Sequence, residues 1–177
     1  MDHEKELREY CRTERQDQIR ETLKPLDLIV LKGKWYNPIT HFIRHRTSTA
    51  WTHVAIYVGD GKLVEAVAKG VIVTPLEHYA GRTRVVLRYR LPIHEAHVTA
   101  ALVWLDEQVK TAIPYDLVAF LGFVTGIKAF EEEDKFFCSE LPTYAYREAK
   151  INLWNEIPEF PYPCDYLQMN DFAPVNN

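Results

Sequence analysis

Trp51-Thr-His53-Val-Ala-Ile-Tyr-Val-Gly-Asp-Gly-Lys-Leu-Val-Glu65-Ala66 holds two short apolar runs on either side of a Gly-Asp-Gly turn. Runs of this length, rich in branched residues and joined by a glycine-containing turn, are typical of an antiparallel β-hairpin. His53 opens the first run and Glu65 lies on the second, so the two side chains can face each other as cross-strand neighbours. The sequence therefore predicts a hairpin that presents an imidazole and a carboxylate on one face.

The rest of the chain extends this hairpin into a sheet and then turns helical. Periodicity and turn residues predict further strands over 26–31, 71–74 and 83–91. Beyond Pro92 the apolar residues fall at helical spacing over 96–109 and again over 114–124. We expect one domain over 1–177, with an N-terminal helical extension (1–24), a core (25–150) and an extended, proline-rich tail (151–177).

Cys138 lies at the start of a third helical segment, in Phe136-Phe-Cys138-Ser-Glu-Leu141. Pro142 is tolerated only in the first turn of a helix, so this helix should begin near Phe137 or Cys138. A helix N-terminus favours a thiolate over a thiol, which predisposes Cys138 to act as a nucleophile. His53 would be its base and Glu65 would fix the imidazole tautomer. Taken singly, each residue also suits an ordinary structural role.

Two motifs resemble one enzyme family. The segment from His53 to Glu65 resembles the histidine half of NlpC-type papain-like cysteine peptidases, and Pro114-Tyr115 with Cys138-Ser-Glu-Leu resembles the cysteine half. Leu26-Asp-Leu resembles the Gly-Asp-Leu strand that precedes the histidine. The two halves stand in reversed order, which is similar to the circularly permuted, YiiX-like branch of that superfamily. Ala55 and Glu140 stand where the general pattern has glycine, which puts the substrate groove in doubt.

The resemblance implies an α+β fold of the permuted papain-like type, in which a small, barrel-like antiparallel sheet packs against the helix that bears the cysteine. It implies a thiol hydrolase with a Cys138, His53 and Glu65 triad that cleaves an amide bond through a thioester, in a small peptide of peptidoglycan or of another source. It implies no cofactor. The alternatives are a lipid acyl hydrolase or acyltransferase of the permuted branch, and a binding module that has lost the chemistry.

Further residues could line such a site. The Tyr115 hydroxyl could lie near the developing oxyanion, and Trp51 could line the groove, although both residues equally suit a packed core. Arg44, with Arg46, could bind a carboxylate or phosphate of the substrate, or could belong to a solvated basic loop. His41 and His45 are four residues apart but lack a third ligand at useful spacing, so we expect no metal site.

Composition limits the partners and the compartment. The 177 residues carry 21 basic and 25 acidic side chains, a formal charge of −4, so the chain as a whole does not attract nucleic acid or an anionic membrane. Three scattered cysteines indicate a reducing compartment, and the first twenty residues are too charged for a signal peptide. Residues 117–124, the longest apolar run, are too short to span a bilayer. We therefore expect a cytoplasmic protein without stable membrane insertion; its oligomeric state stays open.

Overall fold

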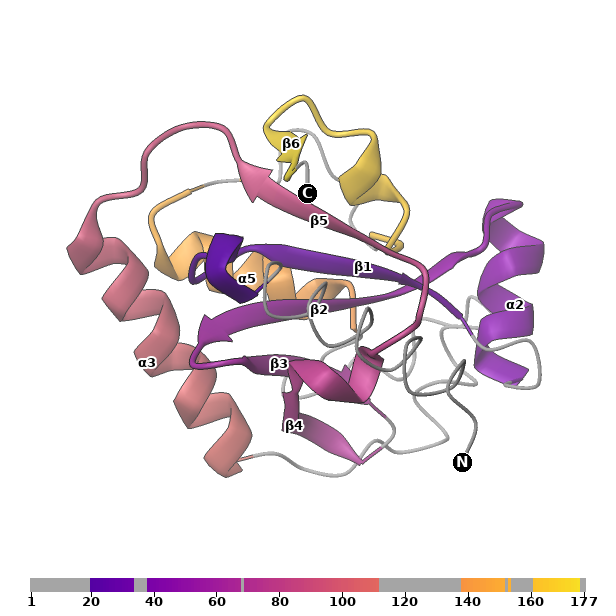
Figure 1. Cartoon of the computed structure of the whole chain (residues 1–177), viewed down its shortest axis with the longest axis horizontal. Helices are drawn as coiled ribbons and strands as arrows, with labels where there is room; N and C mark the ends of the chain where they lie inside the picture. Colours follow the sequence, from indigo (N-terminus) through magenta and orange to yellow (C-terminus); the bar gives the residue numbers. More distant parts are fainter. Residues whose placement is uncertain are drawn as a thin grey trace, which may run out of the picture.

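The computed structural model describes residues 20–33, 38–67, 69–111, 138–151, 153 and 161–175. Figure 1 shows how the elements are arranged. In chain order they are β1 (Leu28–Lys32), α2 (Pro38–Thr47), β2 (Trp51–Gly59), β3 (Lys62–Val67), β4 (Gly70–Pro75), η1 (Leu76–Tyr79), β5 (Arg84–Tyr89), α3 (Glu95–Thr111), α5 (Glu140–Glu148), η3 (Asp165–Leu167) and β6 (Phe172–Pro174).

A six-stranded sheet organises the fold, in the order β4-β3-β2-β1-β5-β6. Every neighbouring pair is antiparallel. The predicted hairpin is β2 and β3, and its turn residues Asp60 and Gly61 have φ values of 50° and 68°. Two successive left-handed residues match the right-handed twist of the strands, which explains why Asp-Gly stands there. The described strands form an open sheet, so a barrel-like closure stays a prediction.

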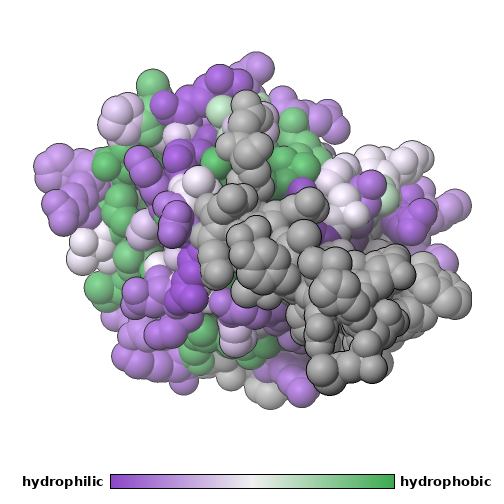
Figure 2. Space-filling model, viewed as in Figure 1, coloured by the Kyte–Doolittle hydropathy of each residue, from purple (hydrophilic) through white to green (hydrophobic). Residues whose placement is uncertain are grey.

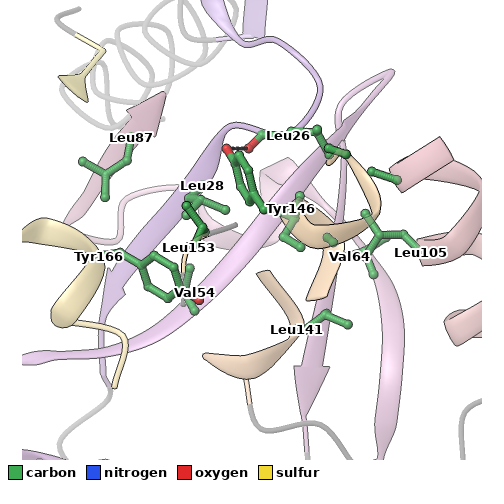
Figure 3. Packing of buried hydrophobic residues seen from close by; sticks show 14 of the residues in the cluster. Leu26, Leu28, Val54, Val64, Leu87, Leu105, Leu141, Tyr146, Leu153 and Tyr166 are labelled. Atoms are coloured by element: carbon green, nitrogen blue, oxygen red, sulfur yellow. Dashed lines mark hydrogen bonds between the residues drawn. The ribbon is translucent and has the colours of Figure 1, made fainter. Parts of the chain in front are cut away.

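One face of the sheet packs against α3 and α5. Leu28, Val54 and Val64 of the strands share a buried cluster with Leu105 of α3 and Leu141 of α5, and Figure 3 shows their packing. Tyr146 of α5 is also buried there, and its hydroxyl donates a 2.8 Å hydrogen bond to the Leu26 carbonyl. The helix that follows Cys138 is thus fixed to the sheet, as predicted.

The opposite face holds a second buried cluster, which includes Leu31, Ala55, Leu63 and Tyr79. Residues two apart on a strand point to the same side. His53 therefore shares this face with Ala55, and Glu65 shares it with Leu63. Leu31, which pairs with His53 in the sheet register, supports the same assignment.

Asp27, at the entrance to β1, holds the N-terminal side of the sheet. The Arg88 guanidinium donates to both carboxylate oxygens, at 2.8 and 2.7 Å, and the Lys24 backbone N–H donates to one of them. Asp27 is buried. A buried carboxylate requires such partners, so Asp27, part of the Leu-Asp-Leu motif, has a structural role in this chain.

The predicted strands and helices that fall within the described residues occur within a few residues of their expected bounds, and the mixed α+β class is confirmed. Helix α5 begins at Glu140, and Cys138 and Ser139 form a turn immediately before it. The tail is not simply extended, because it contributes η3 and the edge strand β6. The predicted helix over 114–124, Tyr115 and most of the N-terminal extension lie outside the described residues. No helix within the described ranges is long and apolar enough to cross a membrane.

Candidate active site

His53 and Glu65 meet across the β2–β3 hairpin. The His53 Nε2 atom and the Glu65 Oε2 atom form a short hydrogen bond. The Glu65 side chain is almost completely buried, at 2% exposure, whereas 17% of the His53 side chain reaches solvent. The imidazole is therefore held by a buried carboxylate and keeps a small part of its surface exposed to solvent.

Two further residues hold the Glu65 carboxylate. The Tyr79 hydroxyl donates a 2.5 Å hydrogen bond to the same Oε2 atom and lies 3.5 Å from His53 Nε2. Thr74, on the neighbouring strand β4, hydrogen-bonds to Glu65 through its side chain. Helix η1 follows β4 directly and brings Tyr79 over the hairpin. Sequence analysis missed both residues, because a threonine on a strand and a tyrosine in a short helix carry no distinguishing spacing.

These contacts set the charges of the pair at neutral pH. Burial acts to raise the pKa of Glu65, but the hydrogen bond and charge of His53, with the hydrogen bonds from Thr74 and Tyr79, lower it to about 2. Burial acts to lower the pKa of His53, but hydrogen bonds and charge interactions with Cys138 and Glu65 raise it to about 9. Burial, and then the Glu65 carboxylate, raise the pKa of Tyr79, which stays a donor. At neutral pH the group is a carboxylate beside an imidazolium.

Cys138 approaches the same imidazole from the turn before α5. Its side chain is partly exposed, and its interaction with the His53 ring raises the pKa of that ring. Because Nε2 is bonded to Glu65, Nδ1 is the ring nitrogen that remains for the thiol. An imidazolium beside a cysteine favours the thiolate, which is the nucleophilic form. The structure thus brings Cys138, His53 and Glu65 together in a line, with the histidine in the middle.

Tyr166 fixes the turn that carries Cys138. Its hydroxyl, fully buried in η3, donates a 2.5 Å hydrogen bond to the Ser139 carbonyl and lies 2.8 Å from the Thr143 hydroxyl oxygen. Both partners follow Cys138 within five residues. The backbone beside the thiol is therefore held by a side chain from the C-terminal part of the chain. No sequence pattern marked Tyr166 for this position.

The other predicted site residues are not brought into this group. Trp51 packs partly against the core on the α3 and α5 side, with the Lys32 Nζ atom 5.2 Å from its ring centroid. Arg44 is exposed in the last turn of α2. No hydrogen bond or ion pair between described residues joins either side chain to Cys138, His53 or Glu65. His41 and His45 are exposed, and no group of three potential metal ligands occurs in the described ranges.

Comparisons with known proteins give a fold and no family. No protein-family model matches the chain. No curated protein matches it. Among solved structures, the chain is similar to the crystal structure of the metalloprotein yiiX from Escherichia coli O157:H7, with 17% identity and a TM-score of 0.62. The match covers 88% of this chain and 97% of that one. At this identity the likeness establishes a shared fold only.

Proposed function

We propose that this protein is a thiol hydrolase that cleaves an amide bond in a small peptide, with Cys138 as nucleophile, His53 as general acid and base, and Glu65 as the residue that orients His53. The observation that carries the proposal is that the His53 ring hydrogen-bonds to Glu65 through Nε2 and also interacts with Cys138. This is the arrangement that an activated nucleophile needs, with the base oriented by a third group.

The reaction follows from the protonation states. The Cys138 thiolate attacks the amide carbonyl carbon, a C–S bond forms, and the oxygen becomes an oxyanion. The His53 imidazolium gives its proton to the departing nitrogen, the C–N bond breaks, and an amine leaves a thioester behind. His53, now neutral, removes a proton from water as it attacks the thioester, which releases the carboxylic acid and restores the thiolate–imidazolium pair.

Glu65 and Tyr79 keep the imidazole in one orientation during these transfers. Glu65 accepts from Nε2 in both halves of the cycle, which leaves Nδ1 as the atom that exchanges protons with sulfur, amine and water. Tyr79 donates to the same carboxylate and so favours its ionised form. The backbone N–H of Cys138 is our candidate donor to the oxyanion, because the turn before α5 is held in place by Tyr166.

The shared fold with yiiX supports a papain-like, permuted connection of the halves, with the histidine half first. That relative is a metalloprotein, which raises the question of a metal in this chain. The residues of the site do not suit one, because the Glu65 Oε2 atom already accepts hydrogen bonds from His53 and Tyr79 and is therefore not free to bind a cation.

The rate of Cys138 alkylation by iodoacetamide against pH, resolved by mass spectrometry, tests the proposal directly. We expect rapid labelling well below the ordinary thiol pKa of about 8.5, and clear slowing in His53→Ala. Cys164, which is buried, provides an internal control in the same digest. Slow labelling with the pH profile of an ordinary thiol in both proteins would refute an activated nucleophile and leave a binding module as the better description.

A further inference from the structure

Charge is unevenly distributed along the chain. From Leu28 to Gly59, which covers β1, α2 and β2, there is no aspartate or glutamate, whereas Lys32, Lys34, Arg44 and Arg46 give this segment a formal charge of +4. Because the whole chain carries −4, the remaining residues carry −8. The segment that contains His53 therefore carries a net positive charge, although the protein as a whole is acidic. In Figure 2 the surface at the α2 end is mostly hydrophilic or intermediate.

Two arginines from outside this segment lie beside the same part of the sheet. The Arg82 guanidinium stacks over the Tyr79 ring, 5.0 Å from its centroid, and the Tyr79 and His53 ring centroids are 6.2 Å apart. Arg84 stands opposite Leu31 in the register, and Leu31 stands opposite His53 on its other side, so Arg84 and His53 share one face. Both arginines are only partly exposed.

We define the cationic rim as Arg82 and Arg84. Arg82 donates to the Lys32 carbonyl and Arg84 donates a 3.3 Å hydrogen bond to the Tyr79 carbonyl, so both guanidinium groups are anchored close to Tyr79. Within the described part of the chain, no carboxylate lies at ion-pair distance from either arginine. The pKa of Arg84 is lowered by burial alone, as expected for a guanidinium that has lost water without gaining an anion.

We propose that the cationic rim selects substrates that carry a negative group beside the scissile bond, which in a peptide is a carboxylate. The inference rests on the proposed thiol site and specifies its substrate class. Two guanidinium groups without carboxylate partners among the described residues, beside the His53 and Tyr79 side chains, create a positive potential that raises the local concentration of anions and holds one by charge-assisted hydrogen bonds. The Glu65 charge is matched by the His53 imidazolium, so only the Cys138 thiolate opposes this potential.

Two alkylating agents of almost equal size test the rim without a known substrate. Iodoacetate carries a carboxylate next to the reacting carbon and iodoacetamide carries a neutral amide. The quantity to measure is the ratio of their rates at Cys138, at low ionic strength, in the wild type and in Arg82→Gln and Arg82→Gln/Arg84→Gln. Lys110→Gln is the matched control, because it removes the same charge from an exposed site on α3.

We expect each rim substitution to lower the iodoacetate-to-iodoacetamide ratio by about two- to fivefold, as screened interactions over several ångströms predict. Added salt should lower the ratio in the wild type and remove the difference between proteins, and Lys110→Gln should keep the wild-type ratio. A ratio that is unchanged in the rim variants and insensitive to salt would overturn the proposal. Circular dichroism identifies a double variant that fails to fold, in which case Arg82→Gln alone decides.

The two proposals fail separately in this design. If iodoacetamide labels Cys138 slowly and with an ordinary pH profile, the thiol hydrolase is refuted whatever the ratio. If iodoacetamide labelling is rapid and depends on His53, but the iodoacetate-to-iodoacetamide ratio is the same in the wild type and the rim variants, the proposed hydrolase is retained and the anionic substrate class is wrong.

Discussion

Replacing the buried Glu65 by glutamine tests the charge pair at the centre of the site. The rise in the pKa of His53 from 6.5 to about 9 corresponds to about 3 kcal/mol of preference for the imidazolium in the folded state. Both Cys138 and Glu65 contribute to this preference of His53 for its charged form. We therefore expect Glu65→Gln to lower the free energy of unfolding by about 1–3 kcal/mol near neutral pH. The glutamine keeps the shape and loses only the charge.

The loss should depend on pH in a defined direction. A raised pKa in the folded state contributes stability that is fully present below the unfolded value, 6.5, and is lost as pH rises through about 9. The lowered pKa of Glu65 contributes stability above about 4.5, which is lost as pH falls through about 2. Urea unfolding of wild type and variant should thus differ most near pH 6 and clearly less near pH 10.

Glu77→Gln is the matched control, because this glutamate pairs with Arg20 at 3.7 Å and both side chains are about half exposed. An exposed pair of this kind contributes less than about 1 kcal/mol. If Glu65→Gln were no more destabilising than Glu77→Gln at pH 6, or if its effect grew as pH rose to 10, the assignment of a buried ion pair would be wrong.

Three further substitutions follow from the hydrogen bonds and packing around the site. Tyr79→Phe removes the donor to the buried carboxylate and should cost about 1–3 kcal/mol in urea unfolding; a loss below that of an exposed Tyr→Phe control would argue against the contact. Tyr166→Phe frees the Ser139 carbonyl and should cost about 1–2 kcal/mol while altering the iodoacetamide rate; an unchanged rate would mean that the turn needs no such support. Gly33→Ala would place its Cβ 2.0 Å from the Thr52 hydroxyl oxygen, so we expect about 1–3 kcal/mol of destabilisation by thermal melting, and wild-type stability would refute this packing.

The sheet was largely predictable because its signals are local. Alternating apolar residues and glycine turns lie within a few residues of each other, and the β2–β3 hairpin follows from the Asp60-Gly61 turn almost directly. The order of the strands was not predicted, since β1 lies between β2 and β5 through contacts far apart in sequence. Strand β6 was missed because a proline-rich tail does not indicate a strand, although Pro174 is acceptable at the end of an edge strand.

The residues with a direct chemical role in the candidate site could be predicted from the sequence, whereas the residues that hold them in position could not. Cys138, His53 and Glu65 were chosen from nucleophile, base and carboxylate chemistry, and the structure brings them together. Tyr166 acts by a hydrogen bond to a more distant segment, and Tyr79 acts from a short helix without distinguishing spacing, so no pattern in the sequence marks either residue. Trp51 and Arg44 were chosen by proximity in sequence, and their side chains lie elsewhere.

His53 and Glu65 lie on the same hairpin, β2–β3, and this affects the order in which the site assembles during folding. Glu65 contacts His53, which lies 12 residues before it in the chain, and Tyr79, which lies 14 residues after it. Cys138 comes much later in the sequence, after helix α3. Short loops close at a smaller entropic cost and more rapidly than long ones. We therefore expect the contacts among His53, Glu65 and Tyr79 to form during folding before Cys138 packs beside them. In a newly made chain, Cys138 would then join a hairpin in which His53, Glu65 and Tyr79 are already paired.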